Sequence, residues 1–348
     1  MAKKVTLKEV AQLAGVSAQT VSRVVNQSAD VATDTRDRVQ QFINELGYQT
    51  NTIARSLITQ HSRTLGVVAT GLEYYGPSSV LVGIQHEAES QGYSLNLYLI
   101  DEPERENAKD LLSELAGRQM DGIIWAVPPI GQNRSIFSNQ RMRHFPPVIF
   151  LHQPSVFSSV VSIDNCAGAE LAVNHLIDQN FRTIGLISGP LSWAEAVQRK
   201  QGWQNALISH GLTPDPSLCV EGDWTAQSGE LAFRKLHDLN LALDAVFVSN
   251  DQMALGILKY AYTQGLNIPF DLGVVGFDDI PESAFFIPSL TTIRQPLKEL
   301  GAAAVREMIT MIRMQSEGKL EYEPKAITLQ PRLIVRESSL KKGISNLL

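Results

Sequence analysis

A short polar segment near the N-terminus holds side chains that can read nucleic-acid bases. Its outward-facing positions are Ser17, Ala18, Gln19, Thr20, Ser22, Arg23 and Asn26. A glutamine can pair in bidentate fashion with adenine, and an arginine with guanine or a phosphate. No acid occupies these positions. The same composition suits a solvated helix face, so these residues alone leave both DNA reading and plain solvation open.

The residues around this segment predict a helix-turn-helix that would hold it in place. Thr6 and Glu9 have capping-box spacing at the start of one helix, and Gly15 can end that helix in a left-handed conformation. Ser17 can cap a second helix, and a third amphipathic helix is expected over residues 33–46. Short helices joined by a tight glycine turn are typical of DNA-binding domains.

Composition and charge are those of a globular protein with one basic end. The 348 residues are 44% apolar and 19% charged, which excludes disordered, collagen-like and disulfide-stapled chains. Cys166 and Cys219 lack metal-ligand spacing and fit a reducing compartment, and we expect neither metal nor cofactor. No signal peptide or membrane span is found, which predicts a cytoplasmic location. Residues 1–63 carry 8 lysines and arginines against 5 acids, which favours a polyanionic partner.

From Thr64 onward, apolar runs alternate with helical stretches. We expect strands at 65–69, 95–100, 122–127, 148–151, 183–187, 245–248 and 274–277. Strands that alternate with helices predict parallel sheets with helices on both faces. These strands are too many for one compact domain, so we expect an α/β core of two lobes. Ligands of such sheets lie beyond the carboxyl ends of the strands, which predicts a binding site in the cleft between the lobes.

The first fifty residues contain long, ungapped motifs. They are Val5-Thr6-Leu7-Lys8-Glu9-Val10-Ala11, Ala14-Gly15-Val16-Ser17, Gln19-Thr20-Val21-Ser22-Arg23-Val24-Val25-Asn26 and Leu46-Gly47-Tyr48. Together they resemble the DNA-binding headpiece of the LacI/GalR family of bacterial repressors. The resemblance implies that the second helix enters the major groove and reads bases through Ala18, Gln19 and Arg23. It assigns further DNA contacts, most of them with phosphates, to Thr6, Leu7, Ser17, Thr20, Ser22, Asn26, Thr35 and Tyr48.

Residues 50–63 resemble the hinge helix and linker of this family. As an isolated peptide the segment is too short for a stable helix. The resemblance implies that two copies, one per subunit, fold and pair in the minor groove at the centre of a palindromic operator, where Leu57 would wedge between base pairs. Its other DNA-contact candidates are Asn51, Ala54 and Arg55. A segment that folds only when paired and bound would act as a switch.

The rest of the chain resembles the family's effector-binding and dimerisation core, which shares its fold with periplasmic sugar-binding proteins. Motifs such as Asn250-Asp251-Gln252-Met253-Ala254 and Gly276-Phe277-Asp278-Asp279 look closest to the lactose-repressor branch. The chain of that fold crosses between lobes three times, here near 162–166, 289–294 and 322–326. The expected organisation is a headpiece (1–49), a hinge and linker (50–63), a core (64–337) and a short tail (338–348). Within the core, we expect an N-lobe (64–163 and 292–323) and a C-lobe (164–291 and 324–337).

The resemblance also places a sugar effector in the cleft. Its candidate ligands are Thr70, Tyr74, Val80, Ala126, His152, Arg199, Trp224, Asn250, Asp278 and Gln295. The Arg199 guanidinium can hold two vicinal hydroxyls, and Trp224 can stack on a sugar ring. His152 stands where the lactose-repressor branch has an acid, which leaves the sugar's identity open. A disaccharide or aryl-type glycoside is the preferred class, with galactosides and glucosides both retained.

The expected function is a transcriptional repressor that a sugar releases from a palindromic operator. A homodimer is expected, because the tail after Glu337 is too short for the C-terminal helix with which the lactose-repressor branch forms tetramers. Three alternatives remain. A ligand could be needed for DNA binding instead of release, or the chain could be a sugar-transport receptor. An enzyme such as a glycosidase would need two carboxylates across the scissile bond, and no second acid distinct from Asp278 and Asp279 is evident.

Overall fold

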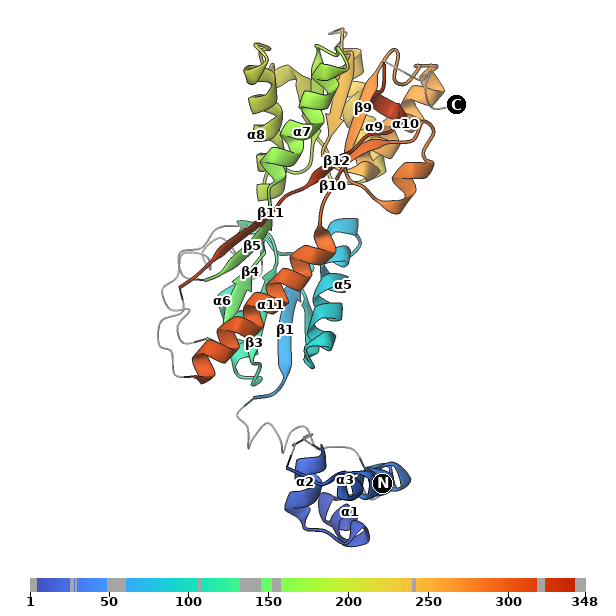
Figure 1. Cartoon of the computed structure of the whole chain (residues 1–348). Coiled ribbons are helices and arrows are strands. Elements are labelled where there is room, and N and C mark those ends of the chain that lie inside the picture. The colour runs from blue at the N-terminus through green and yellow to red at the C-terminus, as the bar shows by residue number, and fades with distance from the viewer. Residues whose placement is uncertain are drawn as a thin grey trace. The chain divides into compact units, whose positions relative to one another are not determined.

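The computed structural model describes residues 5–25, 28, 30–48, 61–105, 108–131, 145–151, 158–239, 242–317 and 323–341. The chain forms two compact units, Met1–Ser62 and Arg63–Leu348 (Figure 1). The first unit contains the predicted headpiece, and the second contains the predicted two-lobed core. No helix of the described segments is long and apolar enough to cross a bilayer.

The headpiece contains helices α1 (Leu7–Ala14), α2 (Ala18–Val25) and α3 (Thr33–Leu46). The predicted capping box is confirmed. The Thr6 amide donates to the Glu9 carboxylate at 2.7 Å, and the Glu9 amide donates to the Thr6 hydroxyl at 3.3 Å. Gly15 ends α1 at φ 64°, as its sequence position predicts. Val10, Val21 and Val39, one from each helix, have no exposed surface and form the centre of this small core.

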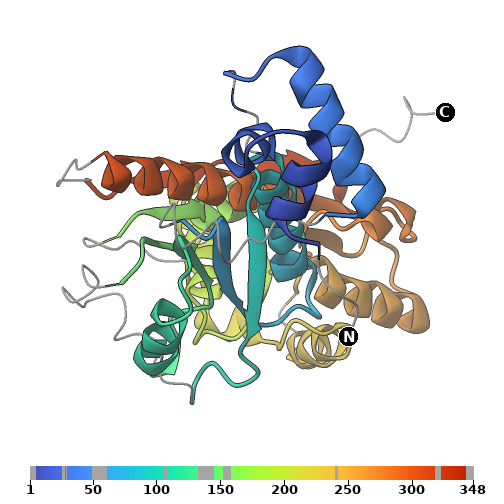
Figure 2. The ribbon, with the colours of Figure 1, turned by 90° about the horizontal axis from the view of Figure 1, so that it is seen from below.

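The N-lobe is a six-stranded sheet with the order β11-β5-β4-β3-β1-β2, and its strands pair in parallel. The strands are β1 (Thr64–Ala69), β2 (Ser94–Leu99), β3 (Gly122–Ala126), β4 (Val148–Phe150), β5 (Val160–Ile163) and β11 (Ala326–Leu329). The helices are α5 (Tyr75–Ser90), α6 (Ala108–Ala116) and α11 (Leu297–Ser316). Figure 2 shows α6 and α11 on opposite sides of this sheet.

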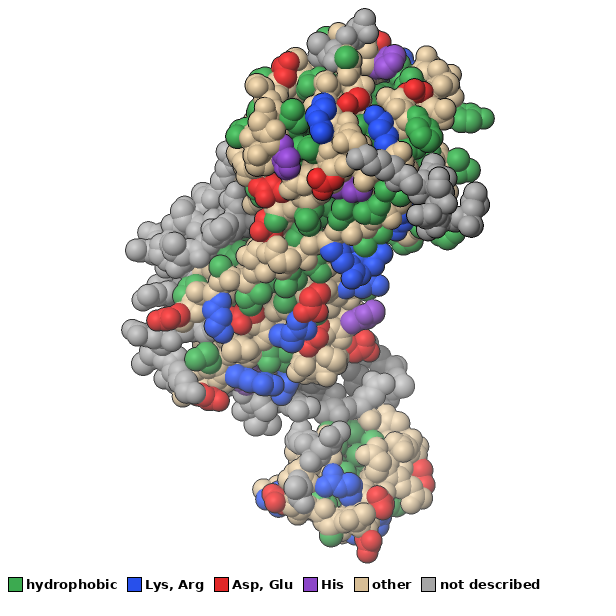
Figure 3. All heavy atoms as spheres, turned by 45° about the horizontal axis from the view of Figure 1, so that its top comes forward, with side chains coloured by type: hydrophobic (Ala, Val, Ile, Leu, Met, Phe, Trp, Pro, Cys, Tyr) green, Lys and Arg blue, Asp and Glu red, His purple; other side chains and the backbone are tan. Residues whose placement is uncertain are grey.

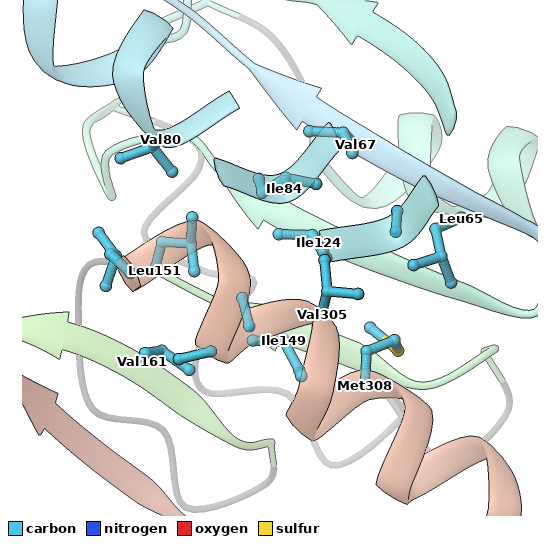
Figure 4. Packing of buried hydrophobic residues seen from close by; sticks show 14 of the residues in the cluster. Leu65, Val67, Val80, Ile84, Ile124, Ile149, Leu151, Val161, Val305 and Met308 are labelled. Atoms are coloured by element: carbon cyan, nitrogen blue, oxygen red, sulfur yellow. The ribbon is translucent and has the colours of Figure 1, made fainter. Parts of the chain in front are cut away.

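Alternation of side chains along the N-lobe strands builds one hydrophobic layer on each face of the sheet. One layer packs against α5 and α11 and includes Leu65, Val67, Ile124, Ile149 and Val161 (Figure 4). The other packs against α6 and includes Val68, Ile123, Trp125, Val148 and Phe150. Strands buried on both faces therefore appear in the sequence as continuous apolar runs.

The C-lobe is a second six-stranded sheet with the order β12-β10-β9-β8-β6-β7. Its strands are β6 (Ile184–Ser188), β7 (Cys219–Glu221), β8 (Ala245–Val248), β9 (Gly273–Asp278), β10 (Thr291–Arg294) and β12 (Arg332–Ile334), of which β12 runs antiparallel to β10. Its α-helices are α7 (Asn165–Asp178), α8 (Ala194–Ser209), α9 (Ala226–Asp238) and α10 (Asp251–Gln264). Short 3₁₀ turns are η3 (Pro216–Leu218), η4 (Pro281–Phe285) and η5 (Glu337–Ser339).

The crossings between the lobes differ in part from those expected. The first lies between β5 and α7, inside 162–166. The second follows Arg294, because all of β10 pairs with β9 in the C-lobe; the boundary expected at 292 was wrong. The third lies at 330–331 and not at 322–326, because β11 pairs with β5 of the N-lobe as far as Leu329. β11 is a half-exposed edge strand, and its sequence lacks the apolar run that marks strands such as β3 and β8.

The tail expected from residue 338 was also placed wrongly. Ser338 and Ser339 have no exposed surface. The Ser338 hydroxyl donates to the Val274 carbonyl at 2.7 Å and accepts from the Thr291 amide at 2.8 Å. Two buried serines are therefore fixed to the central strands of the C-lobe, which extends at least to Leu340. Apolar periodicity cannot reveal a segment that is held by hydrogen bonds.

Candidate effector cleft and DNA-binding surface

A cleft lies between the two lobes, at the carboxyl ends of their strands. It contains about 960 Å³ of space between protein atoms, a volume that includes open solvent at the mouth of the cleft. Eight of the ten expected effector residues line it: Tyr74, Val80, Ala126, Arg199, Trp224, Asn250, Asp278 and Gln295. The structure thus brings together residues that are up to 221 positions apart in sequence, from Tyr74 to Gln295.

Arg199 and Asp278 form the polar centre of the cleft. Arg199 projects from α8 and is only 5% exposed. Its Nε donates to Asn165 Oδ1 at 2.8 Å, and its Nη1 donates to the Ser249 carbonyl and lies 4.0 Å from Asp278 Oδ1. Gln295, directly after the second crossing, donates to Asp278 Oδ1 at 2.6 Å. These bonds hold the guanidinium and the carboxylate in fixed positions while both border the empty space.

Burial shifts the pKa of both groups. Desolvation raises the pKa of Asp278 to about 6, although the Arg199 charge and the Gln295 hydrogen bond oppose the shift. Desolvation lowers the pKa of Arg199, and Asp278 and other nearby carboxylates oppose that shift. Asp251, directly beneath the site, accepts hydrogen bonds from Ile280, Ser283 and Thr292, and burial followed by repulsion from Asp278 raises its pKa to about 7. Asp278 is therefore mainly ionised at pH 7 and ready to accept hydroxyl hydrogen bonds.

Two tryptophans form an aromatic corner beside this polar centre. Trp193 lies just before α8, and its ring meets the Trp224 ring edge-to-face, with centroids 6.0 Å apart. Trp224 is only 8% exposed and adopts φ 75°, and its Nε1 has no hydrogen-bond partner. A Cβ at Gly189 would overlap the Trp224 ring, so glycine is needed there for the ring to reach this place. A buried indole N–H without a partner is a donor that a ligand hydroxyl can satisfy.

Two of the remaining expected residues have local structural roles. Asn250 caps α10 by accepting from the Met253 amide at 2.9 Å, and its Nδ2 donates to the Trp224 carbonyl at 2.9 Å. Asn250 thus positions Trp224 as well as lining the cleft. Thr70 donates to the Ile100 carbonyl at 2.7 Å and is not among the lining residues, so the structure does not bring it together with the other candidates. His152 lies outside the described residues.

The structure adds lining residues that the sequence interpretation missed. The polar and aromatic ones are Asn165, Trp193, Glu195 and Gln252. Glu195 precedes Arg199 by four residues on α8, so helical periodicity could have placed both on one face. Asn165, at the start of α7, has no signal in the sequence. The N-lobe side of the cleft is apolar, with Val67, Ala69, Ile84, Leu151, Ile163, Leu297 and Leu300. Figure 4 shows Val80 and Leu151 at one end of the hydrophobic cluster between the N-lobe sheet and helices α5 and α11.

The headpiece presents the expected base-reading residues on its surface. Val21 and Val24 of α2 are buried, which leaves Gln19 and Arg23 exposed on the other side of that helix. Of the other candidates, Thr6 and Ser17 are exposed, and Leu7, Ala18, Thr20, Ser22, Thr35 and Tyr48 are partly buried. Leu7, Ala18 and Tyr48 pack against the headpiece core. Asn26, Asn51, Ala54, Arg55 and Leu57 lie outside the described residues, as does most of the expected hinge.

The described residues contain no group of three or more histidines, cysteines, aspartates or glutamates that could hold a metal ion. The site is instead a cleft with one buried ion pair, two tryptophans and an apolar wall. A helix-turn-helix domain precedes the lobed core in the same chain. This combination defines a class of protein: a DNA-binding regulator with a pocket for a small effector.

Comparison with known proteins identifies the family. Residues 6–51 match the model of bacterial regulatory proteins of the lacI family, and residues 173–339 match that of the periplasmic binding protein-like domain. The HTH-type transcriptional repressor PurR of Edwardsiella ictaluri (strain 93-146) is 33% identical over 96% of both chains. The chain belongs to the lacI family of bacterial regulatory proteins, which are not enzymes.

Solved structures agree with this assignment. A lac repressor dimer bound to operator and the anti-inducer ONPF matches with a TM-score of 0.83 and 31% identity, over 97% of this chain and all of the other. A complex of the transcriptional regulator CelR with cellobiose matches with a TM-score of 0.71 and 30% identity, over 96% of this chain and all of the other. Because PurR and the lac repressor are almost equally identical to this chain, overall identity does not select one branch of the family.

Proposed function

We propose that this protein is a homodimeric transcriptional repressor that binds a palindromic operator and is released from it by a sugar, a disaccharide or glycoside, in the interlobe cleft. The observation that carries the proposal is the cluster of Arg199, Asp278 and Gln295 beside Trp193 and Trp224. A fixed cation and a fixed carboxylate can together bind adjacent hydroxyls, while tryptophan faces cover the apolar face of a sugar ring.

The lobed fold supplies a mechanism for release. The cleft is lined from both lobes, so a ligand that contacts both stabilises one relative arrangement of the lobes over another. Gln295 lies in the segment of the second crossing and donates to Asp278, so a ligand at Asp278 acts directly on a segment that connects the lobes. The change of lobe arrangement would then separate the two hinge segments, whose pairing the operator requires. A cytoplasmic location follows from the DNA partner.

Exposed apolar side chains on the C-lobe support the dimer. Phe285, the last residue of η4, is 83% exposed, and Ile287, two residues later, is 89% exposed. Figure 3 shows hydrophobic side chains standing out from the upper lobe, which is the C-lobe of Figure 1. Neighbouring exposed apolar side chains are candidates for burial in a protein interface. A twofold dimer also matches the symmetry of a palindromic operator.

The test begins with the unknown operator. Selection of bound duplexes from a random library with the full-length protein should return a palindrome with half-sites about one helical turn apart. Fluorescence anisotropy on that duplex should then show release by a sugar that also raises the melting temperature. If the stabilising sugar instead tightened DNA binding, it would be a corepressor and not an inducer. Stabilisation by purine bases, with no sugar effective, would contradict the sugar assignment and leave the repressor standing.

A matched pair of variants separates the two sites. Arg199→Leu should abolish the response to the sugar and leave operator affinity unchanged, because Arg199 lines the cleft of the core. Arg182→Leu is the control: Arg182 precedes β6 and its side chain donates to the carbonyls of Ile177 and Phe181, outside the lining residues. A sugar response retained by Arg199→Leu would remove Arg199 from the effector site.

A further inference from the structure

Glu195 is the feature of the cleft that the proposed function does not use. It lies in the first turn of α8, one helical turn before Arg199, and it lines the empty space together with Arg199 and Asp278. Its charge acts on Arg199 strongly enough to oppose the lowering of the Arg199 pKa by burial. The polar end of the cleft therefore contains two carboxylates and one guanidinium.

The balance of charge in the cleft disfavours a second anion. The Arg199 guanidinium already faces Asp278 at 4.0 Å, so its positive charge is matched before Glu195 is counted. Among the described residues that line the cleft, Arg199 is the only cation. The opposite wall offers Val67, Ile84, Leu297 and similar apolar side chains, which cannot compensate a charge. A ligand phosphate or carboxylate would lose water, and among the described lining residues it would find only Arg199, whose charge Asp278 already balances.

Neutral hydroxyl groups fit the same surroundings well. The carboxylates of Glu195 and Asp278 accept hydrogen bonds, and the partnerless Nε1 of the 8% exposed Trp224 donates one. Hydrogen bonds to a charged acceptor are stronger than those between neutral groups. A polyol can therefore replace its lost water contacts at this end without bringing a charge into the cleft.

We propose that Glu195 is a specificity-determining residue that makes the cleft selective for uncharged glycosides over their phosphorylated or carboxylated counterparts. This inference rests on the proposed function, since it assumes a carbohydrate effector, and it adds the charge class and the residue that sets it. Two like charges about 5 Å apart in a partly desolvated site repel enough to weaken binding more than tenfold.

The test is isothermal titration of the full-length protein with matched ligands. The probes are methyl β-D-glucopyranoside, its 6-phosphate and methyl β-D-glucuronide, the same three compounds in the galacto series, and cellobiose and lactose. For the wild type we expect the anionic compounds to bind at least about 30-fold more weakly than their neutral parent. Glu195→Gln, which keeps the shape of the side chain, should reduce this ratio of dissociation constants, anionic over neutral, at least about fivefold. Glu89→Gln removes one exposed charge from α5 outside the cleft and should leave the ratio unchanged.

Salt provides a second readout that a purely structural role would not move. Raising the ionic strength should reduce the difference in affinity between neutral and anionic glycosides in the wild type. The effect should be smaller in Glu195→Gln, because screening acts on the charge that the variant lacks. An anionic glycoside that binds as tightly as its neutral parent would overturn the inference and leave the sugar-responsive repressor intact. The inference would also be overturned if folded Glu195→Gln showed the same difference in affinity as the wild type. If no carbohydrate of either charge binds, the sugar effector of the proposed function fails together with this inference.

Discussion

Single side chains in the cleft have properties that a surface position would not give them. Asp278 follows β9 at φ 115°, an unusual conformation for a non-glycine residue, and the adjacent Asp279 adopts φ 55°. Asp279 is held by ion pairs with Arg294 and Arg336, and Asp278 is held by Gln295. The strained turn is thus fixed on both sides, and it directs Asp278 into the cleft.

The raised pKa of Asp278 predicts a pH dependence of effector binding. As the pH falls through about 6, the carboxylate gains a proton and loses acceptor strength, so the affinity for a neutral glycoside should fall. Above pH 7 the affinity should be constant. Isothermal titration from pH 8 to pH 5 measures this. Asp215→Asn serves as the control, because Asp215 is exposed, has a lowered pKa and lies outside the lining residues. An affinity that is flat to pH 5 would contradict the role of Asp278.

Gln19 is the headpiece residue whose substitution should change base preference. It is exposed on α2 and lies at a base-reading position of the family. Gln19→Ala should relax the preference at one operator position by about 1–3 kcal/mol. Competition binding with operators mutated one base pair at a time gives the value. Gln41→Ala on α3, where the side chain bonds only to Glu45 of its own helix, should leave every preference unchanged. A uniform loss across all sequences would make Gln19 a backbone contact.

At the scale of elements, the contact between α5 and α11 sets the N-lobe side of the cleft. The two helices meet where a Cβ at Gly83 would overlap the backbone of Lys298, and one at Gly301 would overlap the carbonyl of Val80. Glycine on both helices lets the backbones approach closely. Val80, Leu297 and Leu300, from the same contact, line the cleft.

Gly83→Ala should therefore destabilise the N-lobe. The added methyl group meets backbone and not a mobile side chain, so the helices must separate, at a cost of about 1–3 kcal/mol in the free energy of unfolding. Urea denaturation measures the loss. Gly76→Ala in the same helix has open space around its Cβ, so it should be neutral or slightly stabilising. Equal stability of the two variants would show that α5 can shift without cost.

At the scale of the whole molecule, operator and effector should influence each other by the same factor. If a sugar lowers operator affinity, saturation with operator must lower sugar affinity equally. Titration of the sugar with and without the selected operator tests this equality. An unchanged sugar affinity would contradict induction through the cleft.

Operator affinity should also fall steeply with salt. A plot of the logarithm of the association constant against the logarithm of salt concentration should have a slope of about −0.9 per phosphate contact.

The sequence by itself determined the organisation of the protein. The capping box at Thr6 and Glu9, the turn at Gly15 and the third helix at 33–46 follow from local hydrogen bonding and helical periodicity, and the structure has all of them. The apolar runs marked seven of the strands. Six of them are buried on both faces and are therefore apolar throughout, whereas the seventh, the edge strand β2, is apolar in sequence but largely exposed. Residues such as Arg199 and Trp224 were found only through resemblance to a family.

Only the tertiary structure decided which of those residues meet. Asn165, Trp193 and Glu195 enter the cleft because α7 and α8 begin at its edge, while Thr70 is drawn away by the Ile100 carbonyl. β11 and the buried serines after residue 337 escaped detection because edge pairing and hydrogen bonds hold them. Local patterns record which face of an element is buried. The charge and shape of a cleft depend on contacts between residues far apart in the chain, and those exist only once the lobes have folded.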